Sequence, residues 1–173
     1  MIHTFHPTDD NDTRLSMHLP DEAATLQLGT TLAPALATGL VIWLEGDLGS
    51  GKTTLTRGIL HGLGYTGKVK SPTYTLIEPY TVSRLNLYHF DFYRFISPDE
   101  FLDAGLDEYF SGTGICIVEW PDKAHPYLGS PDITITFAPE THGRNIQIAA
   151  HSSAGHQCLK TLTPLLPPQH RVS

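Results

Sequence analysis

Basic residues and cysteines are both scarce in this chain of 173 residues. Only 11 lysines and arginines stand against 18 acidic residues, which gives a formal net charge of −7. Affinity for a nucleic-acid backbone comes mostly from clustered lysine and arginine, so a chain this acidic is a poor candidate for holding DNA or RNA by itself. The two cysteines, Cys116 and Cys158, show no zinc-type spacing. These shortages argue against a basic nucleic-acid-binding domain and against a cysteine-built scaffold.

Targeting and membrane signals are also missing. Residues 1–12 lack the basic-then-apolar layout of a signal peptide. Residues 23–44 carry no charge and are formally long enough to span a bilayer, but Pro34, two glycines and five polar residues interrupt the run. We therefore interpret this run as an amphipathic helix, a turn and a buried strand. A cytoplasmic protein that does not enter the membrane is expected.

Helical and strand patterns alternate along the chain, which is typical of an α/β fold. Asp21 suits the N-cap of a first helix, and Pro34 and Gly39 mark its end. Later helices are expected over residues 52–63, 99–110 and 154–162, and strands over 40–44, 74–82, 84–90, 115–118, 133–137 and 145–149. The pattern predicts a mixed central β-sheet flanked by helices. This single domain is expected over residues 20–163, between an N-terminal extension at 1–19 and a loose C-terminal tail at 164–173.

The strongest motif lies at residues 46–53, where G-D-L-G-S-G-K-T fits G-x-x-x-x-G-K-[ST] between a predicted strand and a predicted helix. Glycines let successive backbone N–H groups point into one concavity, and the helix N-terminus adds partial positive charge for a phosphate. Lys52 would reach the β- and γ-phosphates, and the Thr53 hydroxyl would bind Mg²⁺. The predicted nucleotide contacts are Gly46, Asp47, Leu48, Gly49, Ser50, Gly51, Lys52, Thr53 and Thr54. The motif predicts a P-loop NTPase-like domain that uses ATP and Mg²⁺.

Two carboxylates are candidate partners for this loop. Asp91 and Glu119 each close an apolar run, and a carboxylate at the C-terminal end of a strand points into the crevice that holds the phosphate loop. Either acid could instead be a capping or salt-bridging surface residue. Thr73, after Pro72, fits a switch threonine that orders against the γ-phosphate and equally fits an ordinary turn residue.

Three further segments accompany the loop, S-P-T-Y-T at 71–75, H-F-D-F-Y-R at 89–94 and E-W-P at 119–121. With them the chain resembles the bacterial TsaE (YjeE) ATPases of tRNA threonylcarbamoyladenosine biosynthesis, from about residue 20 to the last predicted helix. The resemblance implies Thr53 and Glu119 as magnesium ligands, and Asp91 in contact with magnesium or water. It also implies a catalytic role for Lys52, Asp91 and Glu119. Trp120 would lie beside the site, and Asp21 and Arg144 near the nucleotide.

The same resemblance implies a role and partners. ATP hydrolysis would support the threonylcarbamoyl-transfer complex formed by the TsaD and TsaB proteins. Because the sequence shows a complete phosphate loop with Asp91 and Glu119 but no evident arginine finger or phosphoacceptor site, we expect this hydrolysis to be slow in the isolated protein. The modified base in this family is the adenosine next to the tRNA anticodon. Because the chain is acidic, those partners would hold the tRNA.

Other classes of P-loop protein remain alternatives. A small-molecule kinase needs several arginines over the transferred phosphate, and only Arg94 and Arg144 lie in the second half of the chain before the tail. A GTPase is disfavoured because the sequence has no N-K-x-D and no D-x-x-G after the phosphate loop. A nucleotide-sensing interaction module with negligible turnover would use the same residues, so the sequence leaves it open.

Overall fold

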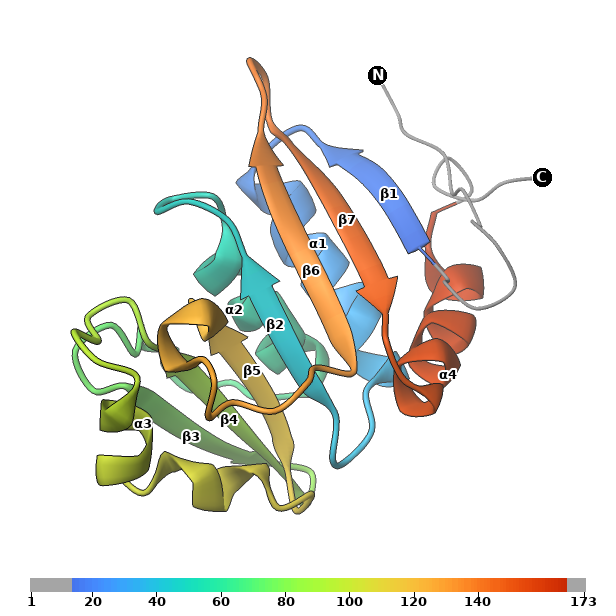
Figure 1. The fold of residues 1–173 in the computed structure, drawn as a ribbon. Helices are drawn as coiled ribbons and strands as arrows, with labels where there is room; N and C mark the ends of the chain where they lie inside the picture. Colours follow the sequence, from blue (N-terminus) through green and yellow to red (C-terminus); the bar gives the residue numbers. More distant parts are fainter. Residues whose placement is uncertain (1–13, 168–173) are drawn as a thin grey trace.

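The computed structural model describes residues 14–167, within which seven strands form one sheet in the order β1-β7-β6-β2-β5-β4-β3 (Figure 1). The strands are β1 (Arg14–Leu19), β2 (Val41–Glu45), β3 (Ile77–Val82), β4 (Leu85–Asp91), β5 (Ile115–Glu119), β6 (Ile133–Pro139) and β7 (Arg144–Ala150). Strands β6, β2, β5 and β4 are parallel, whereas β3, β7 and β1 add antiparallel pairs at the two sides. The expected α/β fold with a mixed sheet is confirmed.

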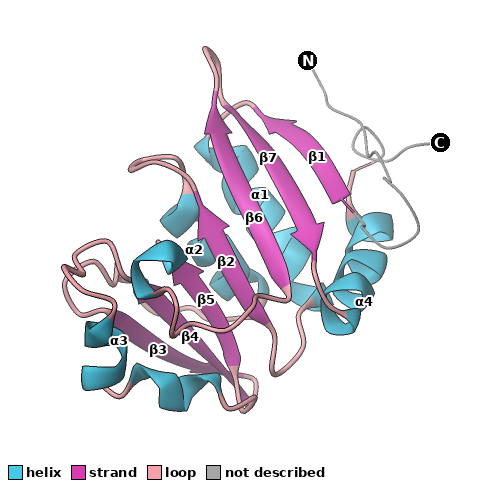
Figure 2. Ribbon diagram, viewed as in Figure 1, coloured by secondary structure: helices cyan, strands magenta, loops and turns pink. Residues whose placement is uncertain are grey.

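Four α-helices and four short 3-10 turns complete the described chain. They are α1 (Glu22–Leu32), η1 (Ala33–Ala35), α2 (Lys52–Gly62), α3 (Asp99–Asp103), η2 (Leu106–Phe110), η3 (Pro121–Ala124), α4 (Ser153–Leu162) and η4 (Thr163–Leu165). Figure 2 shows α1 and α2 behind the sheet and α3 near β3. Among residues 14–167, no helix is long and apolar enough to cross a membrane.

Strand β5 is buried on both faces because each face meets its own apolar cluster. Successive side chains of a strand point to opposite faces. Ile115 and Ile117 therefore join the larger cluster, which contains residues of α1 and α2, while Cys116 and Val118 join a second one. The second cluster is rich in aromatic rings. The strand predicted over residues 115–118 is thus confirmed.

The structure of residues 14–19 contradicts the prediction that residues 1–19 form an N-terminal extension outside the domain. They form β1, an edge strand that pairs antiparallel with β7 along its whole length. Leu15, Met17 and Leu19 are buried and alternate with more accessible residues, which is the pattern of a half-buried strand. The remainder of the predicted extension, residues 1–13, lies outside the described residues.

Three other boundaries also differ. The helix predicted over 99–110 is interrupted at Gly105, whose φ of +68° separates α3 from η2. The strand predicted over 74–82 begins only at Ile77, because residues 72–76 form a turn in which the Leu76 N–H donates to the Pro72 carbonyl at 2.8 Å. In the predicted tail, η4 continues from α4 and Leu166 is buried in the larger cluster. Residues 168–173 lie outside the described part.

Helix α2, which follows the glycine-rich loop, crosses α1 at a pair of glycines. A Cβ atom at Gly29 would lie 2.5 Å from the carbonyl oxygen of Leu55, and a Cβ atom at Gly58 would overlap the carbonyl of Leu26. The two backbones therefore touch without side chains between them. This contact fixes α2, and with it the loop at its start, against α1.

The helix crossing yields a stability prediction for Gly58→Ala. Helix propensity alone would make this change stabilising by about 1 kcal/mol. Because the new methyl group must push the two backbones apart, we expect it instead to lower the free energy of unfolding by about 1–3 kcal/mol in urea titrations. His61→Ala, at an exposed position of the same helix, should stay within about 0.5 kcal/mol of the unchanged chain. A stabilised Gly58→Ala protein would contradict the tight crossing.

Candidate functional site

The site begins at the glycine-rich loop between β2 and α2. Gly51 is the N-cap residue of α2 and has a φ of +110°, a left-handed conformation that favours glycine. A Cβ atom at this position would also overlap the guanidinium of Arg144. Among the described residues, no side chain caps the start of α2. The first N–H groups of the helix are thus available to an anion, together with the positive end of the helix dipole.

A cavity of about 310 Å³ opens over this loop. Its lining comes from the loop, the starts of α1, α2 and β7, the turn before β3, the ends of β4 and β5, and Trp120 directly after β5. The lining residues are Glu22, Leu48, Gly49, Ser50, Gly51, Lys52, Thr53, Thr54, Thr73, Asp91, Glu119, Trp120 and Arg144. Residues far apart in the sequence are therefore brought together as the motifs predict.

Three of the predicted contact residues lie outside that lining. Gly46 and Asp47 line a neighbouring cavity of about 270 Å³, which shares Trp120 with the first. Asp21 is the N-cap of α1, as its pattern predicts, and accepts a hydrogen bond from the Ala24 N–H at 2.8 Å. Its neighbour Glu22 lines the main cavity instead. No motif in the sequence distinguishes Glu22 from other acidic residues in the first turn of a helix.

Lys52 is charged yet only 4% exposed. Its ammonium donates to the carbonyl of Gly46 and, at 3.0 Å, to that of Asp47, and it lies 4.5 Å from the centre of the Trp120 ring. Burial lowers the pKa of Lys52, while the negative charges of Glu119, Asp91 and Asp47 oppose that shift. The lysine is held at the base of the loop, with Trp120 against it.

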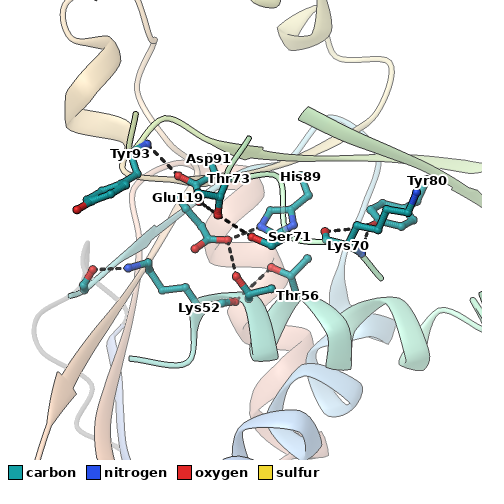
Figure 3. Close-up of polar contacts among 12 residues, drawn as sticks. Lys52, Thr56, Lys70, Ser71, Thr73, Tyr80, His89, Asp91, Tyr93 and Glu119 are labelled. Atoms are coloured by element: carbon teal, nitrogen blue, oxygen red, sulfur yellow. Dashed lines mark hydrogen bonds and ion pairs between the residues drawn. The ribbon is translucent and has the colours of Figure 1, made fainter. Parts of the chain in front are cut away.

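Glu119 lies at the end of β5, is 3% exposed and is held from two sides. The Thr53 hydroxyl donates to its Oε2 atom at 3.1 Å. The Nε2 atom of His89 lies 2.6 Å from the same oxygen, and Figure 3 shows His89 and Glu119 side by side. His89 belongs to one of the sequence segments, but its part in the site was not predicted. A signal was present, since strand alternation places a residue two positions before Asp91 on the same face of β4.

Asp91 ends β4 directly opposite Glu119 in the parallel pair, which brings the two carboxylates to one edge of the sheet. Its Oδ2 atom accepts from the Thr73 hydroxyl at 3.2 Å, and its Oδ1 atom accepts from the Tyr93 N–H at 2.8 Å. Burial raises the pKa of Asp91 and the charge of Glu119 raises it further, while the Tyr93 N–H lowers it. Figure 3 shows Thr73 beside these two acids.

Arg144 is the first residue of β7, which lies on the opposite side of β2 from the strands that carry the two carboxylates. Its Nη1 atom donates to the Ser50 carbonyl at 3.0 Å. The Nε atom of Arg144 and the Oγ atom of Ser50 are buried and have no hydrogen-bond partner within the described chain. Both residues line the cavity, but these two atoms are buried and are not accessible from it.

These groups fit a nucleotide phosphate with its magnesium ion. The N-terminus of α2, Lys52 and Arg144 supply positive charge, and the Thr53 hydroxyl and the two carboxylates supply the oxygen ligands that Mg²⁺ prefers. In residues 14–167, no group of three or more histidine, cysteine, aspartate or glutamate side chains forms a complete metal cage. Magnesium does not need one, because it is usually held by one or two carboxylates together with substrate phosphates.

The chain has the fold of a P-loop NTPase-like domain. In such a domain a buried strand leads through a glycine-rich loop into a helix, here α2 from Lys52, and carboxylates lie at the ends of neighbouring strands. Comparison with known proteins narrows this class. The family profile of threonylcarbamoyl adenosine biosynthesis protein TsaE matches residues 19–146. The chain belongs to the TsaE family.

Individual relatives agree with this assignment. The tRNA threonylcarbamoyladenosine biosynthesis protein TsaE of Haemophilus influenzae is 38% identical over 154 residues, which cover 86% of this chain and 98% of that protein. The protein of the same name from Nostoc sp. is 44% identical over 128 residues, or 72% of this chain and 78% of the relative. The crystal structure of YdiB from Bacillus subtilis superposes with a TM-score of 0.75 at 33% identity, covering 90% of this chain and 98% of that one.

The buried carboxylate of Asp91 yields a prediction of pH-dependent stability. Because the pKa of Asp91 is raised in the folded chain, its contribution to stability is fully present below the unfolded pKa of about 4 and is lost as pH rises through the folded pKa. Asp91→Asn removes the charge and should raise the free energy of unfolding near pH 8 by about 0.5–2 kcal/mol, measured without nucleotide or metal.

The stability difference between Asp91→Asn and the unchanged chain should shrink as the pH falls through the raised pKa of Asp91, because the aspartate of the folded chain then becomes neutral as well. Asp107→Asn, at an exposed position of η2, provides the control and should show no such widening with rising pH. A difference that grows toward low pH would contradict the raised pKa.

Proposed function

We propose that the chain binds Mg-ATP and hydrolyses it as a step of tRNA threonylcarbamoyladenosine biosynthesis. The observation that carries the proposal is the meeting of Lys52, Thr53, Asp91 and Glu119 in one cavity at the start of α2. A lysine and a hydroxyl at the helix start, facing two carboxylates, are the parts that phosphoryl transfer from a nucleoside triphosphate requires. The relatives' names supply the biosynthetic process.

Each residue has a role in this proposal. Lys52 and the N–H groups at the start of α2 bind the β- and γ-phosphates, and Arg144 braces the loop through the Ser50 carbonyl. Thr53 and Glu119 hold Mg²⁺, which when bound neutralises charge on the phosphates. Asp91 contacts the metal or the attacking water. Each of its oxygens accepts one hydrogen bond from the protein and keeps a lone pair for such a ligand.

Partner proteins complete the proposed function. The net charge of −7 disfavours a direct grip on tRNA, so we assign tRNA binding to the TsaD and TsaB proteins and nucleotide turnover to this chain. Within the described chain, the cavity is lined by a single arginine, and that arginine is engaged with the loop. A site so sparsely supplied with cations over the transferred phosphate favours slow turnover in the isolated protein and faster turnover with partners.

The two alternative functions gain no support from a specific contact. Arg94, one of the two arginines considered for a kinase, stacks on Tyr74 with its guanidinium 4.1 Å from the ring centre and does not line the cavity. A sensing module without turnover would use the same cavity, so an assay must separate it from an ATPase.

The hydrolysis prediction is tested by phosphate release from Mg-ATP, with and without TsaD, TsaB and tRNA. We expect slow release by the isolated protein and an increase with the partners. Lys52→Ala should lower the partner-stimulated rate by about a hundredfold or more, because it removes the charge that stabilises the phosphates. Lys160→Ala, at an exposed position of α4, is the matched control and should leave the rate unchanged.

The outcomes of this assay separate the three functions. Equal rates for Lys52→Ala and the unchanged chain would refute the ATPase proposal. Transfer of phosphate to a small metabolite would favour a kinase. Full tRNA modification by a Glu119→Ala protein that no longer releases phosphate would favour the sensing module.

Nucleotide binding has an independent optical test in Trp120. Its ring lines the main cavity and lies 4.5 Å from the Lys52 ammonium, so a phosphate that draws the ammonium away changes the surroundings of the ring. Trp43→Phe leaves Trp120 as the only tryptophan of the chain. We expect its fluorescence to change saturably with Mg-ATP, whereas the signal of a Trp120→Phe protein should stay nearly constant. An unresponsive Trp120 would argue against phosphate binding beside Lys52.

A further inference from the structure

His89 lies in the middle of β4 with its side chain fully buried. Its Nε2 atom is 2.6 Å from Oε2 of Glu119, and in the described structure its Nδ1 atom has no hydrogen-bond partner. Figure 3 shows the ring beside the Glu119 carboxylate. A histidine that only fills space in a core would cost free energy relative to an apolar side chain, because a polar ring loses its contacts with water. The contact with Glu119 therefore needs an explanation.

We infer that His89 is a positioning residue, which holds the Glu119 carboxylate in the orientation that receives the metal ion of the proposed Mg-ATP site. The inference rests on the proposed function of that site. In this role His89 donates a hydrogen bond to a residue that binds the metal. The hydrogen bond restricts the rotation of the Glu119 carboxylate and so orients its free lone pairs toward the metal.

The sheet register explains why His89 reaches Glu119. His89 pairs with Ile117 and Asp91 pairs with Glu119 in the parallel strands β4 and β5. Side chains two residues apart on one strand share a face, so His89 and Asp91 both project to the face on which Glu119 lies. Glu119 is the last residue of β5, where only one side of its backbone continues the strand. A neighbour on β4 can therefore limit the orientations of its side chain.

The hydrogen bonds on Glu119 leave part of the carboxylate for a ligand. The Thr53 hydroxyl and the His89 ring both bind Oε2, and the described residues provide no side-chain hydrogen bond to Oε1. Thr53 is itself a proposed metal ligand, and its hydroxyl can offer a lone pair to the metal while its O–H still donates to Glu119. His89 is the contact on Oε2 that comes from a residue with no metal-binding role of its own.

The contact with Glu119 shows which ring nitrogen acts as the donor. A carboxylate oxygen only accepts hydrogen bonds, so the Nε2 atom of His89 donates to Oε2 of Glu119. The Nδ1 atom has no hydrogen-bond partner in the described structure. His89 is therefore a hydrogen-bond donor toward the carboxylate.

The test compares His89→Asn with His89→Gln. The amide nitrogen of glutamine reaches the place of Nε2, whereas asparagine is one methylene shorter and loses the contact with Glu119. Leu87→Ala is the packing control, because Leu87 is fully buried two residues earlier on the same face of β4. Mn²⁺ binding to the full chain with a non-hydrolysable ATP analogue is measured by electron paramagnetic resonance, alongside the thermal midpoint without ligand.

We expect His89→Asn to weaken Mn²⁺ binding about ten- to a hundredfold, the usual cost of losing a residue that orients a metal ligand. His89→Gln should recover most of this loss, and Leu87→Ala should lower the thermal midpoint while leaving Mn²⁺ affinity nearly unchanged. With Mg-ATP, His89→Asn should raise the Mg²⁺ concentration for half-maximal turnover. Metal-free binding of the ATP analogue should stay the same.

Three results would overturn the inference. The first is an Mn²⁺ affinity of His89→Asn equal to that of the unchanged chain. The second is an equal loss of affinity in the His89→Asn, His89→Gln and Leu87→Ala proteins. The third is a ¹⁵N NMR spectrum in which the Nε2 atom of His89 carries no proton. The NMR experiment uses the unchanged chain and does not depend on the folding of a variant. Failure of the unchanged chain to bind Mn²⁺ with the analogue would overturn the proposed function together with the inference. Normal binding by both the unchanged chain and His89→Asn would overturn the inference alone.

Discussion

Three charged side chains, Lys52, Asp91 and Glu119, share a buried space at one end of the sheet, each no more than 5% exposed. Removing charges from water is costly unless they are paired or hydrogen-bonded. The surrounding structure meets this requirement with loop carbonyls for Lys52, a hydroxyl and a ring nitrogen for Glu119, and a hydroxyl and a backbone N–H for Asp91. Because these groups come from four separate segments, the buried charge ties the loop, the turn before β3 and both strand ends together.

The mixed sheet makes this arrangement possible. Parallel strands β2, β5 and β4 end at the same edge, which places the loop and both acids within reach of one ligand. Antiparallel β7 begins at that edge, beside the end of β6, and runs away from it, so its first residue, Arg144, lies close enough to bind the loop carbonyl of Ser50. The directions of these strands therefore determine that the loop, the two acids and Arg144 lie at the same edge of the sheet.

Much of this site could be predicted because its parts carry local signals. The loop motif, the apolar run of β5 and the acids at two strand ends are each visible in a few adjacent residues. Strand β1 was missed because its partner, β7, lies more than a hundred residues away, and six alternating residues are a weak pattern without that partner. Glu22 and His89 were missed for a similar reason, since their importance depends on neighbours supplied by the fold.

The backbone contact between Gly29 and Gly58 has a mechanical consequence. Two helices whose main chains interlock cannot slide past each other without a steric clash. Helix α2 is therefore held rigidly against α1, and so are the phosphate-binding groups at its start. The turn that carries Thr73 is held to Asp91 by hydrogen bonds instead, one from the Thr73 hydroxyl at 3.2 Å and one from the Asp91 N–H to the Leu76 carbonyl at 3.1 Å. Hydrogen bonds can lengthen and re-form, whereas interlocked main chains cannot pass each other, so we expect structural adjustment around a bound nucleotide on the side of the cavity formed by that turn.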